Sequence, residues 1–298
     1  FNIIDYDVLI PYGDEYSNEM MFHFLKEKGI RYDARPIAHI IFDVAPFIFT
    51  KKKYKNIFVG NYYATKSYPL AVSLAGYNAR IHYLDDGTQA LELFSDNPKP
   101  RYNKLSIKVV ILFYRILAFL KNVRKSVFFT MYDVKSEKYR IEKNSFETLR
   151  SNNNSEKKGA FIIGTNSSIL EFIDASYIDY IKELVVSIKV LFPGETIYYC
   201  PHRRDTNNKY IESILKEIGI EIFNTKVSVE YDFLTKHINP KYVVGFLSNS
   251  LYTLKKMFPD TRVETVSYNL VDNGQNEENK LIEHGLNNND IQSIYPFK

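Results

Sequence analysis

The chain contains 298 residues, about twice the size of the commonest domain, so two domains are expected. Its composition, 45% hydrophobic, 25% charged and 15% aromatic, excludes collagen-like, low-complexity and disordered chains. The 39 basic and 35 acidic residues leave a formal net charge of +4, too small an excess to predict a nucleic-acid partner. The single cysteine, Cys200, cannot form a disulfide within the chain, which favours a reducing compartment over secretion.

Short β-rich runs alternate with longer amphipathic segments, the pattern of βαβ units and a mostly parallel sheet. In the first half, this pattern predicts strands over residues 8–12, 38–43, 57–59 and 80–84. It predicts helices over 17–29 and 67–75, ended by Gly29 and Gly76. We therefore expect an α/β fold from the start of the chain.

The second half repeats the alternation after a stretch, 150–159, that contains no apolar side chain and is expected to be a linker or an exposed loop. Strands are predicted over residues 160–163, 196–199, 220–223, 242–246 and 262–266. Helices are predicted over residues 168–191, 208–218, 230–237 and 249–257. The expected domains are residues 1–155 and 156–298, with a cleft between them and a C-terminal tail free to pack back on the first domain. Because open parallel sheets bind ligands at the carboxyl ends of their strands, functional residues are expected there.

Two adjacent carboxylates, Asp85 and Asp86, follow the strand predicted over 80–84 and precede the turn residue Gly87. A carboxylate at a strand's carboxyl end is well placed for a catalytic base. Neighbouring side chains on an extended segment point to opposite faces, so at most one of the two enters a cleft while the other anchors the loop. The same residues are also typical of an ordinary turn before a helix.

An imidazole and two guanidinium groups follow the strand over 196–199, in the run from Pro201 to Asp205. His202 can donate a proton near neutral pH, and Arg203 or Arg204 can donate two hydrogen bonds to a phosphate. These residues therefore predict an anion site. The alternative is a surface loop in which one arginine pairs with Asp205.

Small polar residues follow two other predicted strands. Ser248, Asn249 and Ser250 begin the helix over 249–257, where hydroxyls and unpaired backbone N–H groups bind phosphate without a lysine. The same residue types serve equally well as helix N-caps. The strand over 160–163 ends in the comparable run Gly164, Thr165 and Asn166. Neither run is a Walker A loop or a dinucleotide-binding glycine fingerprint.

Glu230 opens the helix predicted over 230–237, where its carboxylate is suited either to the hydroxyls of a ribose or simply to the helix N-terminus. Other chemistries find little support in the sequence. The six histidines and one cysteine have no zinc-site spacing, and no G-x-S-x-G elbow is present. Metal-dependent and serine-nucleophile hydrolysis are therefore disfavoured.

The stretch 104–125 combines apolar runs with lysine and arginine and contains no acidic residue. It is too interrupted by Lys108 and Arg115 to span a bilayer. A basic amphipathic helix of this kind is suited to the surface of an anionic membrane. It is equally consistent with a helix packed on the first domain with solvated lysines.

In chain order, the acidic pair with Gly87, the run from Pro201 to Arg203 and the run from Ser248 to Ser250 resemble three motifs of bacterial sialyltransferases. Those motifs are acidic-acidic-glycine, histidine-proline and serine-rich. The resemblance is strongest to the lipooligosaccharide sialyltransferases of glycosyltransferase family 52 and runs from about residue 80 to 266. It implies a GT-B-like fold of two Rossmann-like domains facing a central cleft, with the acceptor-side domain first and the CMP-sugar domain second. It also implies CMP-sialic acid as the donor and no metal or other cofactor.

The resemblance implies that Asp86 is the general base on the acceptor hydroxyl and that His202 hydrogen-bonds or protonates the departing CMP phosphate. The other residues implied to contact substrate or nucleotide are Asp85, Gly87, Gly164, Thr165, Asn166, Arg203, Glu230, Ser248, Asn249 and Ser250. Among these, the serine-rich run would hold the phosphate and Glu230 the ribose. Two positions depart from the family, because Arg203 replaces the proline of the histidine-proline motif and Ser167 replaces a carboxylate. The second departure leaves only Asp85 or Asp86 to serve as the base.

The implied reaction is an inverting transfer of sialic acid to a terminal galactose of a surface glycan, such as lipooligosaccharide or capsule, with an α2,3 linkage. The alternatives are a GT-B transferase that uses another nucleotide sugar or makes polysialic acid, and a non-catalytic glycan- or nucleotide-binding module. The expected location is the bacterial cytoplasm, peripheral on the inner face of the plasma membrane through residues 104–125. A homodimer is left open.

Overall fold

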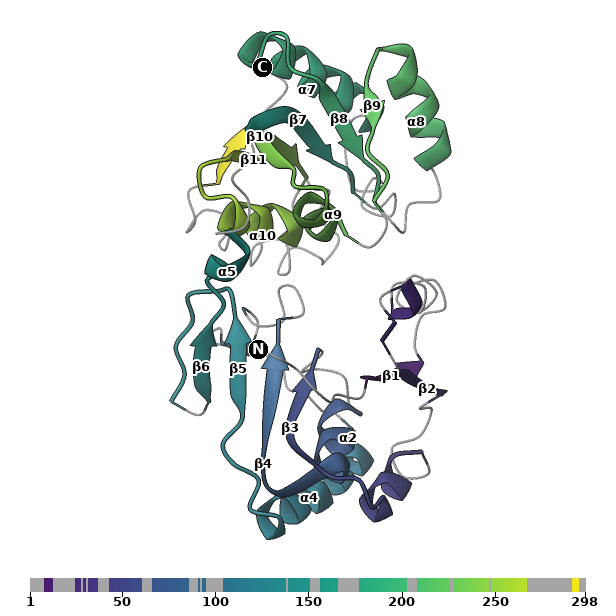
Figure 1. Cartoon of the computed structure of the whole chain (residues 1–298), viewed down its shortest axis with the longest axis vertical. Coiled ribbons are helices and arrows are strands. Elements are labelled where there is room, and N and C mark those ends of the chain that lie inside the picture. Colours follow the sequence, from purple (N-terminus) through teal and green to yellow (C-terminus); the bar gives the residue numbers. More distant parts are fainter. Residues whose placement is uncertain are drawn as a thin grey trace. The chain divides into compact units, whose positions relative to one another are not determined.

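A computed structural model of the chain describes most of its residues (Figure 1). They are residues 8–12, 25–27, 29–30, 32–36, 43–60, 66–85, 91, 93–94, 104–137, 139–150, 156–165, 177–202, 208–225, 228–246, 248–266 and 291–294. These residues form two compact units, Phe1–Asn144 and Ser145–Lys298. Each unit is built on a parallel sheet of its own.

The first unit is built on a four-stranded parallel sheet with its strands in sequence order. The strands are β3 (Tyr54–Val59), β4 (Ala75–Leu84), β5 (Val127–Thr130) and β6 (Arg140–Lys143). Before them come the 3-10 helix η2 (Ala45–Phe49) and a separate parallel pair, β1 (Val8–Tyr12) and β2 (Tyr32–Pro36). β1 confirms the strand predicted over 8–12. The sequence pattern did not predict β2, and of the strand expected over 38–43 only Asp43 is described, outside any strand.

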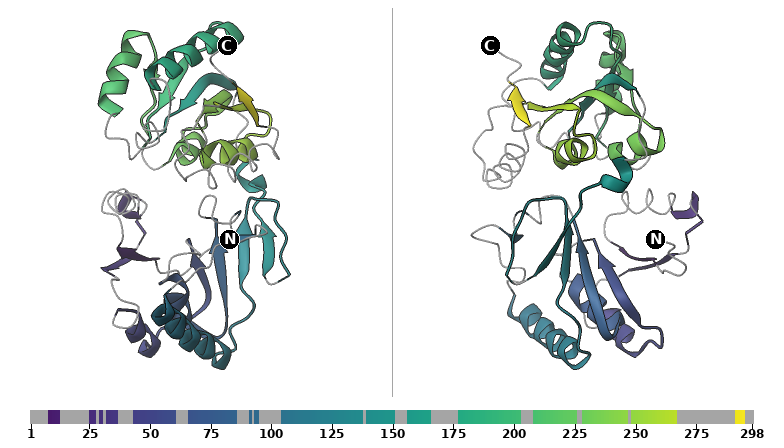
Figure 2. Two further views of the ribbon diagram at one scale, coloured as in Figure 1. Left: turned by 180° about the vertical axis from the view of Figure 1, so that it is seen from behind. Right: turned by 60° about the vertical axis from the view of Figure 1, so that its left-hand side comes forward.

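Two helices pack side by side on one face of this sheet, α2 (Ser67–Leu74) and α4 (Leu105–Leu120) (Figure 2). Val72 of α2 and Tyr114 of α4 meet Ile81, Tyr83 and Phe128 of the sheet in one buried core. Most of the helix predicted over 17–29 lies outside the described residues. Within the described part of this range, residues 25–27 are helical.

The passage from α2 into β4 corrects the predicted end of the helix. Ala75 is already extended, with φ −63° and ψ 131°, so the chain enters the strand without a left-handed residue. Gly76 therefore lies within β4 rather than closing the helix. Two ammonium groups bind the carbonyls at this junction: Lys121 Nζ donates to Ala75 O at 2.9 Å, and Lys53 Nζ donates to Ser73 O at 2.9 Å.

The second unit contains a six-stranded parallel sheet in the order β12-β11-β10-β7-β8-β9. Its strands are β7 (Lys157–Ile163), β8 (Ile197–Cys200), β9 (Glu221–Ile222), β10 (Asn239–Gly245), β11 (Arg262–Val266) and β12 (Gln292–Ile294). Its helices are α5 (Glu147–Arg150), α7 (Tyr177–Leu191), α8 (Asn208–Glu217), α9 (Val229–Thr235) and α10 (Asn249–Met257). Every strand and helix predicted here has a counterpart, although residues 168–176 of one predicted helix lie outside the described residues.

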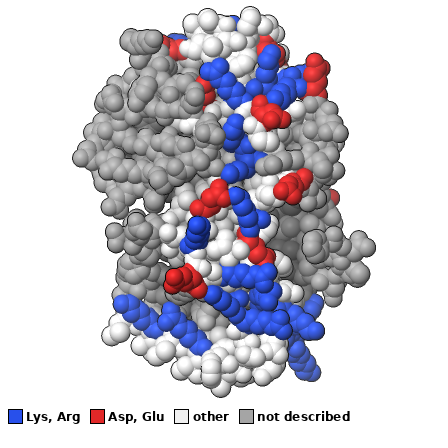
Figure 3. Space-filling view, turned by 90° about the vertical axis from the view of Figure 1, so that its left-hand side faces the viewer, with Lys and Arg blue, Asp and Glu red and all other residues white. Residues whose placement is uncertain are grey.

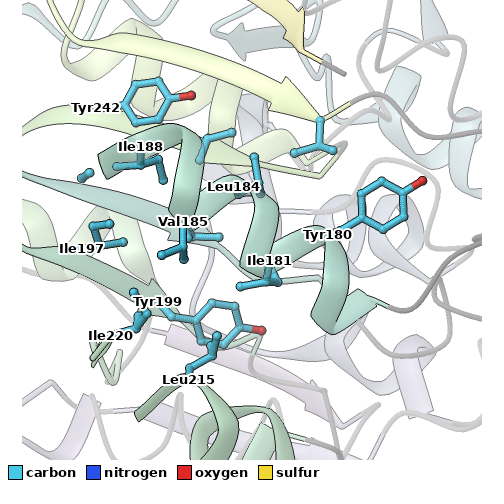
Figure 4. Close-up of a cluster of buried hydrophobic side chains, with 14 of the residues drawn as sticks. Tyr180, Ile181, Leu184, Val185, Ile188, Ile197, Tyr199, Leu215, Ile220 and Tyr242 are labelled. Carbon is cyan, nitrogen blue, oxygen red and sulfur yellow. The ribbon is translucent and has the colours of Figure 1, made fainter. Parts of the chain in front are cut away.

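The sheet of the second unit is covered on both faces. Ala160 and Ile162 of β7 pack with Leu184 of α7 and Leu215 of α8 in the core of Figure 4. Phe161, between Ala160 and Ile162 in sequence, lies on the opposite face of the sheet. The centroids of its ring and of the Phe233 ring in α9 are 4.6 Å apart. A parallel strand buried on both faces reads as a continuous apolar run, as residues 160–163 do.

The stretch expected as a linker, 150–159, is shorter than its composition indicated. Lys157 and Lys158 already pair with Asn239 and Pro240 of β10. The two lysine side chains are exposed at the amino end of the strand. Their backbones pair in the sheet without burying an apolar side chain, so the sequence shows no strand pattern there. At the other end of the chain, β12 pairs with β11 in this same sheet. The remaining tail is not described, so its return to the first domain stays a prediction.

Candidate functional site

The strand order of the second unit reverses between β7 and β10. The chain first adds β8 and β9 on one side of β7, then returns to place β10, β11 and β12 on the other. In open α/β sheets of this order, ligands bind outside the carboxyl ends of the strands at the point of reversal. The registers bring these ends level, since Ile163 of β7 pairs with both Gly245 of β10 and Cys200 of β8. The runs after β7, β8 and β10 therefore start at one edge of the sheet.

Glycines allow the backbones to approach closely at this edge. Gly164 donates its N–H to Cys200 O at 2.9 Å, and a Cβ there would lie 2.6 Å from the Tyr199 hydroxyl and 2.9 Å from that same carbonyl. A Cβ on Gly245 would lie 2.8 Å from Ile163 O. Gly164 was a predicted site residue, whereas Gly245 was missed, although it too is a glycine at the end of a predicted strand.

Thr165 follows Gly164 and is buried, with 6% of its surface exposed. The run Gly164 and Thr165 thus begins next to the central strands, and its role in lining a nucleotide pocket stays a prediction. Asn166 and Ser167 lie outside the described residues.

Ser248 is the N-cap of α10, as the alternative interpretation of this run allowed. Its backbone is extended, and its Oγ accepts a hydrogen bond from the Ser250 N–H at 3.2 Å. The first turn of α10 has no acidic residue, while Lys255 and Lys256 lie in the last turn. The helix dipole therefore keeps a positive end at Asn249 and Ser250 that no neighbouring carboxylate in that turn offsets. Capping and anion binding are compatible here.

His202 is the second residue after β8 and is half-buried. His202 and Gly164 therefore follow neighbouring strands, because β8 pairs with β7. Cys200, the last residue of β8, is buried, and burial raises the pKa of its thiol, which makes it a poor nucleophile. Arg203 is outside the described part of the chain, so its contact with an anion stays a prediction.

Glu230 lies in the first turn of α9, whose N-cap is Ser228. Burial is the main cause of the raised pKa of the Cys200 thiol; the charge of Lys236 lowers that pKa, and the charges of Asp232 and Glu230 raise it further, so α9 lies within electrostatic reach of the end of β8. Asp232 is 1% exposed and pairs with Lys236 at 3.1 Å. Sequence reasoning missed this pair, although its i,i+4 spacing on a helix is a recognisable signal.

In the first unit, Asp85 follows the last residue of β4. Its Oδ2 accepts a hydrogen bond from the Met131 N–H at 2.6 Å, which joins the carboxyl end of β4 to the segment after β5. Burial raises the pKa of Asp85, and hydrogen bonds from Thr130 and Met131 partly offset that rise. Asp86 and Gly87 lie outside the described residues.

The structure therefore brings Gly164, Thr165, His202, Glu230 and the run Ser248–Ser250 to one edge of the second sheet, and it places Asp85 at the corresponding edge of the first. Within the described part of the chain, no group of three or more His, Cys, Asp or Glu side chains could hold a metal ion. The functional groups of the described candidate site residues are hydroxyls, backbone N–H groups, one imidazole and carboxylates.

Comparison with known proteins gives matches at the level of structure. No family model and no curated protein sequence matches the chain. A sialyltransferase from Photobacterium damsela matches with a TM-score of 0.55 and 12% identity, over 97% of this chain and 80% of its own. An α/β-galactoside α-2,3-sialyltransferase from Photobacterium phosphoreum matches with a TM-score of 0.53 and 12% identity, over 96% and 98%.

A 2,6-sialyltransferase from Photobacterium sp. JT-ISH-224, solved with CMP and lactose, matches with a TM-score of 0.51 and 11% identity, over 96% of this chain and 78% of its own. These likenesses extend over nearly the whole chain, although few residues are identical. They confirm the predicted GT-B-like α/β architecture with parallel sheets. The chain has the fold of the bacterial sialyltransferases.

Proposed function

We propose that this chain is an inverting sialyltransferase that moves sialic acid from CMP-sialic acid to a terminal galactose of a surface glycan, such as lipooligosaccharide or capsule, with an α2,3 linkage. The likeness of nearly the whole chain to three sialyltransferase structures carries the proposal. One of those enzymes was solved with CMP and lactose. Assignment to glycosyltransferase family 52 rests on the order of the three sequence motifs.

The level strand ends of the second unit support a CMP site. In the proposal, the run Ser248–Ser250 binds the phosphate at the positive end of α10. This run offers two hydroxyl groups and one side-chain amide, in addition to the backbone N–H groups of the first helical turn. Glu230 binds the ribose, and Gly164 and Thr165 line the nucleotide pocket.

His202 is proposed to stabilise the departing phosphate. Breaking the bond from the anomeric carbon to CMP leaves an oxocarbenium-like centre and places negative charge on a phosphate whose second pKa is about 6. An imidazole and a helix N-terminus at one sheet edge offer hydrogen bonds and a positive field to that charge. Because the leaving group already carries charge, electrostatic stabilisation supplies most of the acceleration. Removing one such donor costs roughly 10²–10³ in rate.

Asp86 is proposed as the general base that removes the proton of the galactose hydroxyl. The contact between Asp85 Oδ2 and the Met131 N–H supports this choice, because it ties one carboxylate oxygen of Asp85 to the backbone after β5. Neighbouring side chains on an extended segment face opposite ways, which leaves Asp86 for the acceptor. A single displacement with the base on the face opposite CMP inverts the anomeric carbon.

The proposal includes no metal or other cofactor, since imidazole, helix terminus and carboxylate account for each charge change. It places the enzyme in the bacterial cytoplasm at the inner face of the plasma membrane, where a lipid-linked acceptor is within reach. Two rivals are tested alongside it: a transferase with another nucleotide sugar or with a polysialic acid product, and a non-catalytic glycan- or nucleotide-binding module.

The test is to incubate the purified chain with CMP-sialic acid, with and without lactose, and to measure CMP release and sialyllactose. We expect CMP release that depends on lactose and a product of inverted configuration. No CMP release above background hydrolysis would refute the proposal. Parallel reactions with UDP- and GDP-sugars identify a transferase that uses another nucleotide sugar, and products longer than sialyllactose identify a polysialic acid product.

Variants separate the enzyme from a binding module. His202→Ala and Asp86→Asn should each lower turnover by roughly 10²–10³, with CMP affinity largely retained in Asp86→Asn. His237→Asn and Asp179→Asn are matched controls at exposed positions, and both should keep turnover within about twofold of the wild type. Asparagine suits His237 because that residue has a φ of 52°. A wild-type chain that binds CMP but shows no turnover would favour the binding module. Unchanged turnover in His202→Ala and Asp86→Asn would contradict the roles proposed for these two residues.

A further inference from the structure

Helix α4 presents a continuous apolar face to solvent. Seven large apolar side chains on it are between 53% and 83% exposed: Leu105, Val109, Leu112, Phe113, Ile116, Phe119 and Leu120. At 100° per residue they fall within an arc of about 120° on the helix. The opposite side is buried in the first unit through Ile111, Tyr114 and Ala118. The exposed arc, called the α4 face below, is thus distinct from the side that holds the helix in the fold.

Cationic side chains border the α4 face. Exposed Lys108 and Arg115 lie along one edge of the arc, and Lys104, Arg124 and Lys125 lie at its two ends. The sequence contains no Asp or Glu from residue 104 to 132. Figure 3 shows Lys and Arg gathered around uncharged surface at the end of the first unit. An apolar stripe with a one-sign border is typical of helices that lie in a membrane interface.

We infer that the α4 face docks the protein on an anionic lipid surface, with its apolar side chains in the boundary between headgroups and acyl chains. Charge complementarity selects this occupant, because anionic headgroups neutralise the bordering lysines and arginines. The helix lies parallel to the lipid surface, since its other side is buried in the core of the first unit. No helix within the described residues is long and apolar enough to cross a membrane.

A second copy of the chain fits the α4 face less well than lipid does. A symmetric contact would bring two sets of the same cations together without a carboxylate between them on this helix. A 16-residue helix is about 24 Å long and about 10 Å wide, so one face covers roughly 250 Å². A stable protein interface needs about 800 Å² on each partner.

Docking through α4 leaves the candidate site of the first unit clear of lipid. The carboxyl end of α4 is joined to the amino end of β4, where the Asn78 N–H donates to Lys121 O at 3.0 Å. Asp85 follows the other end of β4, seven residues beyond Asn78, a span of about 23 Å along a strand. The inference deepens the proposed function by naming the surface that meets the membrane of a lipid-linked acceptor, but lipid binding itself requires no sialyl transfer.

The experiment measures binding of the full chain to vesicles by flotation, without donor or acceptor. We expect binding to phosphatidylcholine vesicles that contain 30% phosphatidylglycerol in 0.1 M salt, and at least tenfold weaker binding to pure phosphatidylcholine or in 0.5 M salt. Equal binding to neutral and anionic vesicles, or no binding to either, would overturn the inference. Vesicle binding by a chain inactive on CMP-sialic acid would support the inference and count against the proposed function alone.

Paired variants test the surface itself. Leu112→Glu with Ile116→Glu should weaken binding to the anionic vesicles at least tenfold, while turnover on lactose stays within about twofold. The matched control is Val186→Glu with Val190→Glu on α7, where the two side chains are 63% and 76% exposed, and it should bind as the wild type does. Equal losses in both pairs would overturn the inference. So would a wild-type dimer in light scattering that the α4 pair converts to monomer, because the α4 face would then belong to a second copy.

Discussion

Replacing Gly164 by alanine tests the close approach at the edge where the second sheet reverses. The new Cβ would lie 2.6 Å from the Tyr199 hydroxyl and 2.9 Å from Cys200 O, whereas ordinary contact begins at 3.4 Å. The two atoms would have to move by 0.8 and 0.5 Å, the differences between those distances. Neither moves easily, because Tyr199 is fully buried and Cys200 O accepts the Gly164 N–H.

Overpacking of this kind costs roughly 1–3 kcal/mol, so we expect a loss of about 2 kcal/mol in the free energy of unfolding. For a unit of roughly 150 residues this lowers the midpoint of thermal unfolding by roughly 4–8 °C. Calorimetry on the full chain measures the transition of the second unit. If Gly164 lines the nucleotide pocket, CMP affinity measured by titration calorimetry should fall as well.

Two controls give this prediction its specificity. Gly60→Ala should change the midpoint little, because nothing lies within 4 Å of the added Cβ. Adding Tyr199→Phe to Gly164→Ala removes the nearest atom and should recover part of the lost stability, leaving the contact with Cys200 O. A Gly164→Ala protein as stable as the wild type would refute the reasoning, as would full additivity of the two changes.

Three further changes have directions set by the structure. Burial raises the pKa of Asp85 in the folded state above 3.8, so the folded state binds a proton more tightly than the unfolded state does. Relative to the Asp85→Asn variant, the wild type should therefore lose stability as the pH rises from 3.8 through the raised pKa. Urea unfolding at a series of pH values measures this difference. Burial and the charge of Lys53 lower the pKa of Lys121 in the folded state to about 8 from 10.5, so the unfolded state binds the proton more tightly. The stability of the wild type relative to Lys121→Met should therefore rise between about pH 8 and 10.5. A stability difference that does not change with pH over this range would contradict the lowered pKa. Ser248→Ala removes the cap of α10 and should cost about 1 kcal/mol in thermal unfolding, and under the proposed function it also weakens CMP binding; unchanged stability would count against the cap.

The sequence by itself determined the alternation of strands and helices, because apolar periodicity and breaking residues are local. Helix 249–257 and strand 262–266 have the predicted bounds. It also placed Gly164, His202 and Ser248 after strands, since parallel strands end where polar residues begin. The predicted bounds were wrong where strand pairing mattered more than composition. Lys157 and Lys158 belong to β7 rather than to a linker, and Gly76 lies within β4 rather than at the end of a helix.

Tertiary structure decided which of these strand ends share an edge. Only the order of the sheet makes β7 the neighbour of both β8 and β10, and only this neighbourhood makes Gly245 tight against Ile163. The hydrogen bond from the Met131 N–H to Asp85 Oδ2 joins two segments that lie 46 residues apart in sequence. The exposed face of α4 likewise depended on which side of the helix the sheet covers. Such contacts join distant segments, and their energies do not appear in the local pattern of residues.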